Sequence, residues 1–176
     1  MHTGLFVIMG VCGSGKSLIG AKLAHDLDIE FVEGDGLHPS DNVRRMAAGM
    51  PLTDDDRHGW LIAIAARLRE AKRAGNGLVV SCSALKRSYR DLLRSVGAAE
   101  VRFVYLAGGP GEGGRALLAE RMANRREHFM PPSLLDSQLA ILEEPSPDEH
   151  AWVCDISAAP HAIVADLVRR AASSLA

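Results

Sequence analysis

Short apolar runs alternate with amphipathic stretches along the whole chain. The apolar runs predict buried strands, which we expect at 5–9, 30–33, 78–80, 101–106 and 151–155. Between them, apolar residues recur three or four positions apart, which indicates helices with one buried face. These helices are expected at 17–27, 41–48, 54–68, 84–96, 115–126, 132–142 and 160–175. Strands that alternate with helices predict an α/β fold with a five-stranded, doubly wound parallel sheet flanked by helices.

A glycine-rich loop follows the first predicted strand and precedes the first predicted helix. It fits G-x-x-x-x-G-K-[ST] at every fixed position, with the residues Gly10, Val11, Cys12, Gly13, Ser14, Gly15, Lys16 and Ser17. Glycines let successive backbone N–H groups point into one anion-sized nest, and the helix adds its N-terminal donors. In this motif Lys16 reaches the β- and γ-phosphates and Ser17 holds Mg²⁺. The loop therefore predicts binding of a nucleoside triphosphate.

Composition limits the class of protein. The 176 residues, 47% of them hydrophobic, predict a single domain over 1–176. The net charge of −2 comes from 20 basic and 22 acidic residues mixed along the chain, which disfavours nucleic acid or an anionic membrane as a partner. No apolar run approaches the roughly 20 residues of a membrane span, and the N-terminal apolar stretch is too short for a signal peptide. We expect a cytoplasmic protein whose three cysteines are buried side chains rather than disulfides.

Candidate polar residues follow the second predicted strand. Asp35 lies just past that strand, at the edge where an open α/β sheet binds ligands; the alternative is an aspartate that only shapes a turn between glycines. His38 either closes the same loop or contacts a substrate. Ser40 and Thr53 are expected to cap the next two helices. Arg57 lies in the first turn of the second of these helices. The helix dipole disfavours a cation at this position, so the presence of an arginine there suggests a function other than stabilising the helix.

Basic residues on two later helices form the remaining candidates. Lys86 and Arg90 share the face of a helix that we expect Ser83 to cap. Arg121 and Arg125 are four residues apart, so they project from one face and suit a helical lid at about 115–145 that closes over phosphates. For both pairs the alternative is a solvated basic face. The glycine-rich segment 108–114 is expected to be a flexible connection.

Five blocks of the sequence resemble the gluconokinase family, in the family's order and over nearly the whole chain. These blocks fall within 9–17, 34–39, 51–60, 82–94 and 128–143. The phosphate loop alone marks a very large superfamily. The Asp-Asp-Asp-Arg run at 54–57 and the Cys-Ser-Ala-Leu-Lys run at 82–86 are much narrower, and they make the resemblance specific.

The resemblance implies ATP-dependent phosphorylation of D-gluconate to 6-phosphogluconate, with ATP and Mg²⁺ bound at the phosphate loop. It also implies a P-loop kinase fold similar to that of shikimate and nucleoside monophosphate kinases, and a homodimer. The implied catalytic residues are Lys16, Asp35, Arg121 and Arg125. Asp35 would accept the proton of the acceptor hydroxyl, and His38 would contact the sugar chain. Gluconate is an anionic polyol, and the candidate cations for its carboxylate, in order of preference, are Arg57, Lys86 and Arg90.

The chain departs from the family pattern at three places. Segment 108–114 replaces an acidic, less glycine-rich helix start, Glu33 stands where aspartate is common, and Cys12 stands where serine is common. Two other functions stay open at this point: a kinase for another small hydroxy acid or nucleotide on the same fold, and a nucleotide-dependent switch. A guanine-specific switch would need an Asn-Lys-x-Asp stretch after the fourth strand, and the sequence has none.

Overall fold

The computed structural model describes residues 3–109, 111–123 and 132–174. Five strands form a parallel sheet in the order β2-β3-β1-β4-β5. The strands are β1 (Leu5–Met9), β2 (Glu30–Glu33), β3 (Leu78–Ser81), β4 (Arg102–Ala107) and β5 (Trp152–Asp155). The chain thus winds outward on both sides of β1, which confirms the predicted doubly wound sheet. All carboxyl ends of the strands meet at one edge, the edge where such sheets bind ligands.

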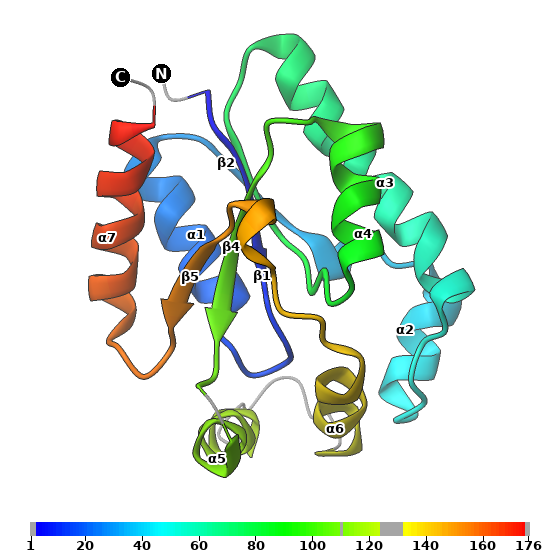
Figure 1. Ribbon diagram of the computed structural model, residues 1–176. Coiled ribbons are helices and arrows are strands. Elements are labelled where there is room, and N and C mark those ends of the chain that lie inside the picture. Colours follow the sequence, from blue (N-terminus) through cyan, green and yellow to red (C-terminus); the bar gives the residue numbers. More distant parts are fainter. Residues whose placement is uncertain (1–2, 110, 124–131, 175–176) are drawn as a thin grey trace.

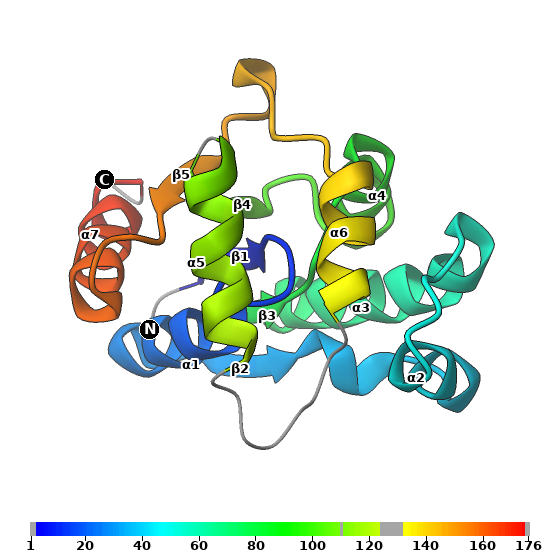
Figure 2. The same ribbon diagram turned by 90° about the horizontal axis from the view of Figure 1, so that it is seen from below.

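Helices cover both faces of the sheet and its carboxyl edge. They are α1 (Lys16–Leu27), α2 (Ser40–Ala47), α3 (Asp54–Ala74), α4 (Arg87–Leu92), α5 (Gly111–Ala123), α6 (Pro132–Ile141) and α7 (Pro160–Ser173), with short helical turns η1 (Gly34–Leu37), η2 (Leu93–Gly97) and η3 (Pro147–Glu149). Helices α1 and α7 pack on one face, and α3 packs with α4 and η2 on the other (Figure 1). Helices α5 and α6 contact each other across the carboxyl edge (Figure 2). No helix in the described ranges is long and apolar enough to span a bilayer.

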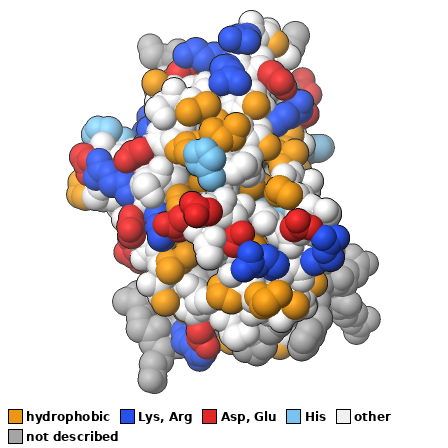
Figure 3. Space-filling model, turned by 90° about the vertical axis from the view of Figure 1, so that its right-hand side faces the viewer, with side chains coloured by type: hydrophobic (Ala, Val, Ile, Leu, Met, Phe, Trp, Pro, Cys, Tyr) orange, Lys and Arg blue, Asp and Glu red, His pale blue; other side chains and the backbone are white. Residues whose placement is uncertain are grey.

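The apolar runs of the central strands form the core. All residues of β1 and β3 are buried, because helices cover both faces of the sheet. Trp60, Ile64 and Leu68 of α3 complete the core on one side. On the surface over α2, α3 and α4, acidic and basic side chains are interspersed (Figure 3), in keeping with the mixing of both signs along the sequence.

The start of α3 confirms the predicted cap. Thr53 Oγ1 accepts from the N–H of Asp56 at 3.2 Å, and the Asp56 carboxylate accepts from the N–H of Thr53 at 2.9 Å. This reciprocal pair is a capping box, which satisfies two backbone donors that a helix start leaves open. Ser40, in contrast, is the first residue of α2, and its side chain makes no capping bond. The prediction for Ser40 was therefore wrong.

Two further local predictions were wrong for steric reasons. Ser83 does not cap α4, which begins only at Arg87, because Ala84 takes a left-handed backbone with φ of 42° that cannot continue a helix. Segment 108–114 is not simply a connection, since α5 already begins at Gly111. A side chain at Gly114 would meet the carbonyl oxygen of Gly108 at 2.3 Å, so glycine here permits a close backbone approach.

Candidate active site

One pocket lies at the carboxyl edge of β1, β2 and β3, beneath α6. The phosphate loop contributes Cys12, Lys16 and Ser17 to its wall. The opposite wall holds Asp35, His38 and Arg57, with Met46, Leu52 and Ser83 beside them, and α6 adds Leu134, Ser137 and Gln138. The fold thus places Lys16 and Ser17, predicted to bind phosphate and Mg²⁺, in one pocket with three residues predicted to bind the phosphoryl acceptor.

The phosphate loop has the backbone that its sequence predicts. Gly10, Gly13 and Gly15 have φ values of 143°, 80° and 95°, in the region that favours glycine. Gly15 occupies the N-cap position of α1 and offers no side chain, so the first N–H groups of α1 stay open to an anion. The Lys16 ammonium donates to the carbonyl oxygen of Val11 at 2.9 Å, which holds it over the loop. This nest fits the phosphates of a nucleotide.

The turn that carries Asp35 and His38 is held by Trp60 of α3. The Trp60 indole N–H donates to the carbonyl oxygen of Gly34 at 2.7 Å. The His38 ring stacks on the Trp60 ring, with 4.1 Å between centroids and 14° between planes. Gly34 packs so tightly that a side chain there would meet the Ser81 carbonyl oxygen at 1.9 Å. The indole therefore fixes both ends of η1, between which Asp35 faces the pocket.

His38 is held in its neutral form. Burial lowers the pKa of His38 from 6.5 to about 4, and the nearby Arg57 lowers it further, while Asp35 opposes the shift. An Asn42 side-chain nitrogen lies 3.4 Å from Nδ1 of the ring. A neutral imidazole has one donor and one acceptor nitrogen, which suits contact with a hydroxyl-rich molecule.

Arg57 is buried and forms no ion pair with any described residue; its guanidinium lies 6.0 Å from the centroid of the Tyr89 ring. Its side chain lines the pocket, only 6% of the residue is exposed, and Nε has no hydrogen-bond partner within the described residues. The neighbouring aspartates are engaged elsewhere: Asp54 accepts from Lys86 at 2.8 Å, and Asp56 accepts from Arg45 at 3.0 Å. The alternative that Arg57 serves only to pair with the acidic helix start finds no ion pair to support it. A desolvated guanidinium facing a pocket favours an anionic ligand.

The two other candidate cations lie elsewhere. Lys86 is not part of the pocket wall; its ammonium binds Asp54, which also accepts from the Tyr89 hydroxyl. Arg90 is fully buried in an ion pair with Glu149, with Nε to Oε2 at 2.6 Å and Nη2 to Oε1 at 2.8 Å. Its Nη1 donates to backbone carbonyls on both sides. The prediction that Arg90 binds the substrate is corrected, because its donors are already occupied by the protein.

Arg121 lies in a second hollow on the other side of the phosphate loop. The hollow is lined by Gly13, Ser14, Gly15, Leu18, Ile19, Arg121, Ile156, Ala158, Pro160 and Ile163. The Arg121 guanidinium donates to the Ile156 carbonyl oxygen at 2.7 Å, so it lies beside the loop and outside the first pocket. Arg125 falls outside the described residues.

Three features were not predicted from the sequence. They are the clamp that Trp60 forms on η1, the mainly apolar second hollow, and Gln138, whose Oε1 accepts from the Cys12 N–H at 2.7 Å. The sequence placed Trp60 on the buried face of its predicted helix and in a resemblance block, and Gln138 only in a resemblance block; neither signal assigns a role. Within the described residues, no cluster of three or more His, Cys, Asp or Glu side chains could hold a metal, so Ser17 is the metal-ligand candidate that the motif leaves.

Comparison with known proteins gives a consistent result. No family model matches the chain. The chain is 45% identical over 163 residues to a gluconokinase of Gluconobacter oxydans, covering 93% of this chain and 88% of that protein. It is 39% identical to the thermoresistant gluconokinase of Escherichia coli, covering 93% and 91%.

Solved structures agree in fold and in sequence. A gluconokinase from Sinorhizobium meliloti superposes with a TM-score of 0.83 at 44% identity, covering 99% of this chain and 97% of that one. A shikimate kinase from Acinetobacter baumannii, at 18% identity and a TM-score of 0.58, shares the fold alone. The identities and coverages to the gluconokinases place this chain in the gluconokinase family.

Proposed function

We propose that this chain transfers the terminal phosphoryl group of ATP to D-gluconate. The observation that carries the proposal is Arg57, a buried guanidinium that forms no ion pair with the described residues and lines the same pocket as Lys16 and Asp35. A phosphate nest alone is compatible with many acceptors, whereas an unpaired buried cation across the pocket selects for an acceptor with a negative charge. Gluconate has that charge at one end and a primary hydroxyl at the other.

The acceptor end of the pocket follows from this arrangement. Arg57 binds the gluconate carboxylate, ideally through two parallel bonds. Asp35 receives the terminal hydroxyl and takes its proton as the new bond to phosphorus forms. His38, neutral because of its burial, bonds to the hydroxyls along the chain of the sugar acid. Lys86, whose ammonium is bound by Asp54 outside the pocket wall, is not assigned a contact with the substrate.

The nucleotide end uses both sides of the phosphate loop. The open N–H groups of the loop and Lys16 hold the phosphates, and the apolar second hollow beside Leu18 takes the nucleoside. Mg²⁺, bound by the phosphates and Ser17, would offset the negative charge of the transferred group. Arg121 and Arg125 remain our candidates for closing over the phosphates from α5 and the segment that follows it.

An assay of ADP release over a panel of acceptors tests the proposal. Gluconate, shikimate, glycerate, glucose and nucleoside monophosphates are compared at equal concentration, with ATP and Mg²⁺ present. We expect gluconate to give the highest kcat/KM. A higher value for any other acceptor, or ADP release that no acceptor changes, would refute gluconate as the substrate. We also propose a cytoplasmic homodimer, which fractionation and light scattering of the purified protein test.

A further inference from the structure

The side chain of Gln138 bridges α6 and the phosphate loop. Its Oε1 accepts from the Cys12 backbone N–H at 2.7 Å. A backbone N–H can only donate, so the carbonyl end of the amide has to face the loop and the NH₂ end has to face away from it. Nε2 has no hydrogen-bond partner within the described residues. Gln138 thus presents a pair of oriented, unused donors.

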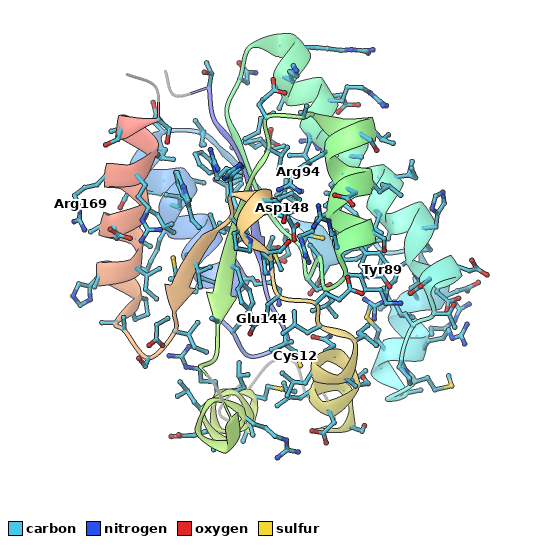
Figure 4. All side chains as sticks on the ribbon, in the orientation of Figure 1. Cys12, Tyr89, Arg94, Glu144, Asp148 and Arg169 are labelled. Atoms are coloured by element: carbon cyan, nitrogen blue, oxygen red, sulfur yellow. The ribbon has the colours of Figure 1, made fainter. Side chains whose placement is uncertain are left out.

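The surroundings of Gln138 indicate which group its two N–H donors can bind. Its side chain lines the same pocket as Lys16 of the phosphate loop and Asp35 of the acceptor wall. Cys12, whose N–H donates the hydrogen bond to Gln138, lies at the end of the sheet that faces α6 (Figure 4). In a phosphoryl transfer, the group that moves has to lie between the nucleotide and the acceptor hydroxyl. Gln138 is therefore placed beside the path of that group.

We propose that Gln138 is a catalytic residue whose Nε2 donates a hydrogen bond to an oxygen of the terminal phosphoryl group. The proposal rests on the proposed phosphoryl transfer from ATP. The bond to Cys12 fixes the amide before the nucleotide binds, so the donor needs no reorientation when negative charge builds on the transferred group. The structural alternative is that the amide serves only as a strut that holds α6 on the loop.

Two substitutions separate the catalytic donor from the strut. Gln138→Glu keeps an oxygen that accepts from the Cys12 N–H but replaces the donor with a negative charge. Gln138→Leu removes both functions at similar size. A strut predicts that the glutamate variant resembles the wild type and that the leucine variant is impaired. A phosphoryl donor predicts the opposite order, with the glutamate variant the more damaged because its carboxylate repels the phosphate.

The experiment measures ATP and ADP dissociation constants by calorimetry without acceptor, and kcat with gluconate. We expect Gln138→Glu to weaken ATP binding at least ~10-fold and to change ADP binding less than about twofold, because only ATP has the terminal phosphate. We expect kcat to fall by about 10²–10³-fold in Gln138→Glu and less in Gln138→Leu. Ala140→Ser, at an exposed position of the same helix, is the control for general disturbance of α6.

The outcomes distinguish this inference from the proposed function. A glutamate variant with wild-type ATP affinity and kcat would refute the donor role, and so would a leucine variant with unchanged kcat and an unchanged preference for ATP over ADP. If the wild type does not phosphorylate gluconate, the proposed acceptor fails, but the comparison of ATP with ADP still decides the role of Gln138. If the glutamate variant does not fold, the leucine variant decides through nucleotide binding: a donor predicts weaker ATP binding with ADP binding nearly unchanged, and a strut predicts that both weaken alike.

Discussion

At the scale of single residues, Arg57 makes the sharpest prediction. Arg57→Ala removes a pair of charge-assisted hydrogen bonds, each worth about 1.5–3 kcal/mol. The loss of one such bond corresponds to a rise of roughly 10–150-fold in the KM for gluconate. We expect a rise of at least this size, because two bonds are lost. The KM for ATP should stay nearly constant. Because only the carboxylate contact is lost, the preference for gluconate over the neutral polyol sorbitol should narrow as well.

A matched control for Arg57 exists on α2. Arg45→Ala removes the same charge from a residue that pairs with Asp56 and does not line the pocket. We expect this variant to retain the ratio of gluconate to sorbitol turnover. If Arg57→Ala also retained that ratio while its melting temperature fell, Arg57 would be a structural residue and another group would have to bind the carboxylate.

His38 gives a prediction about pH. Its pKa of about 4 means that the ring stays uncharged above about pH 5, whereas an ordinary histidine gains its proton near 6.5. We therefore expect the profile of kcat/KM for gluconate to show no inflection from His38 between pH 5 and 8. His38→Gln should raise the KM for gluconate by about 2–12-fold, the value of one neutral hydrogen bond, without changing the shape of that profile. A wild-type inflection near pH 6.5 that the variant lacks would contradict this.

At the scale of elements, Trp60 of α3 positions the turn η1, which carries Asp35. Trp60→Phe keeps an aromatic ring for His38 to stack on but leaves the buried Gly34 carbonyl without its donor, a loss of about 1–3 kcal/mol in the free energy of unfolding. We expect a lower melting temperature together with a lower kcat, because Asp35 lies on the loosened turn. Trp152→Phe, which changes a ring packed against Phe6 at the other side of the sheet, should lower only the melting temperature. Equal kcat values for Trp60→Phe and Trp152→Phe would contradict the proposal that Trp60 positions Asp35.

The strands and the phosphate loop could be predicted from the sequence, because their signals are local. An apolar run of five residues or a glycine at a left-handed position needs no knowledge of the rest of the chain. Arg57 was identified as unusual by its place in a helix start, and in the described part of the chain it forms no ion pair with the aspartates of that start. The start of α4 was misjudged because the left-handed turn at Ala84 depends on packing that no propensity encodes.

The residues that were misassigned or missed depend on contacts across long stretches of chain. Arg90 has the same local context as Lys86, and only its pairing with Glu149, 59 residues away, separates a buried ion pair from a substrate contact. Gln138 meets Cys12 across 126 residues. A single sequence contains no information on which of several polar side chains find such partners.

At the scale of the whole molecule, the Arg90–Glu149 pair joins α4 to the turn before β5. The Arg90 guanidinium lowers the pKa of Glu149 from 4.5 to about 2, with further help from the Ser146 N–H and Arg94. Because the folded-state pKa is depressed, the pair stabilises the fold fully above about pH 4.5 and loses this contribution as pH falls towards 2.

Glu149→Gln tests this pair. The substitution leaves the buried charge of Arg90 uncompensated, so we expect the free energy of unfolding to fall by about 3–5 kcal/mol at pH 7. Urea unfolding at pH 7, 4 and 2.5 should show the difference between wild type and variant shrinking as the wild-type carboxylate becomes protonated. Glu100→Gln, in an exposed pair with Lys72, is the control and should cost no more than about 1 kcal/mol. A difference for Glu149→Gln that is constant with pH would contradict the charged pair.

The order of the strands also governs how the molecule behaves towards its own copies. The two outer strands, β2 and β5, carry Glu30, Glu33 and Asp155 at their ends, and charges on edge strands discourage a further strand from pairing there. The most apolar segments, β1 and β3, are enclosed between other strands and have no exposed edge while the chain is folded. Aggregation should therefore begin from opened molecules, so a ligand that tightens the fold will also protect the protein from precipitating on heating.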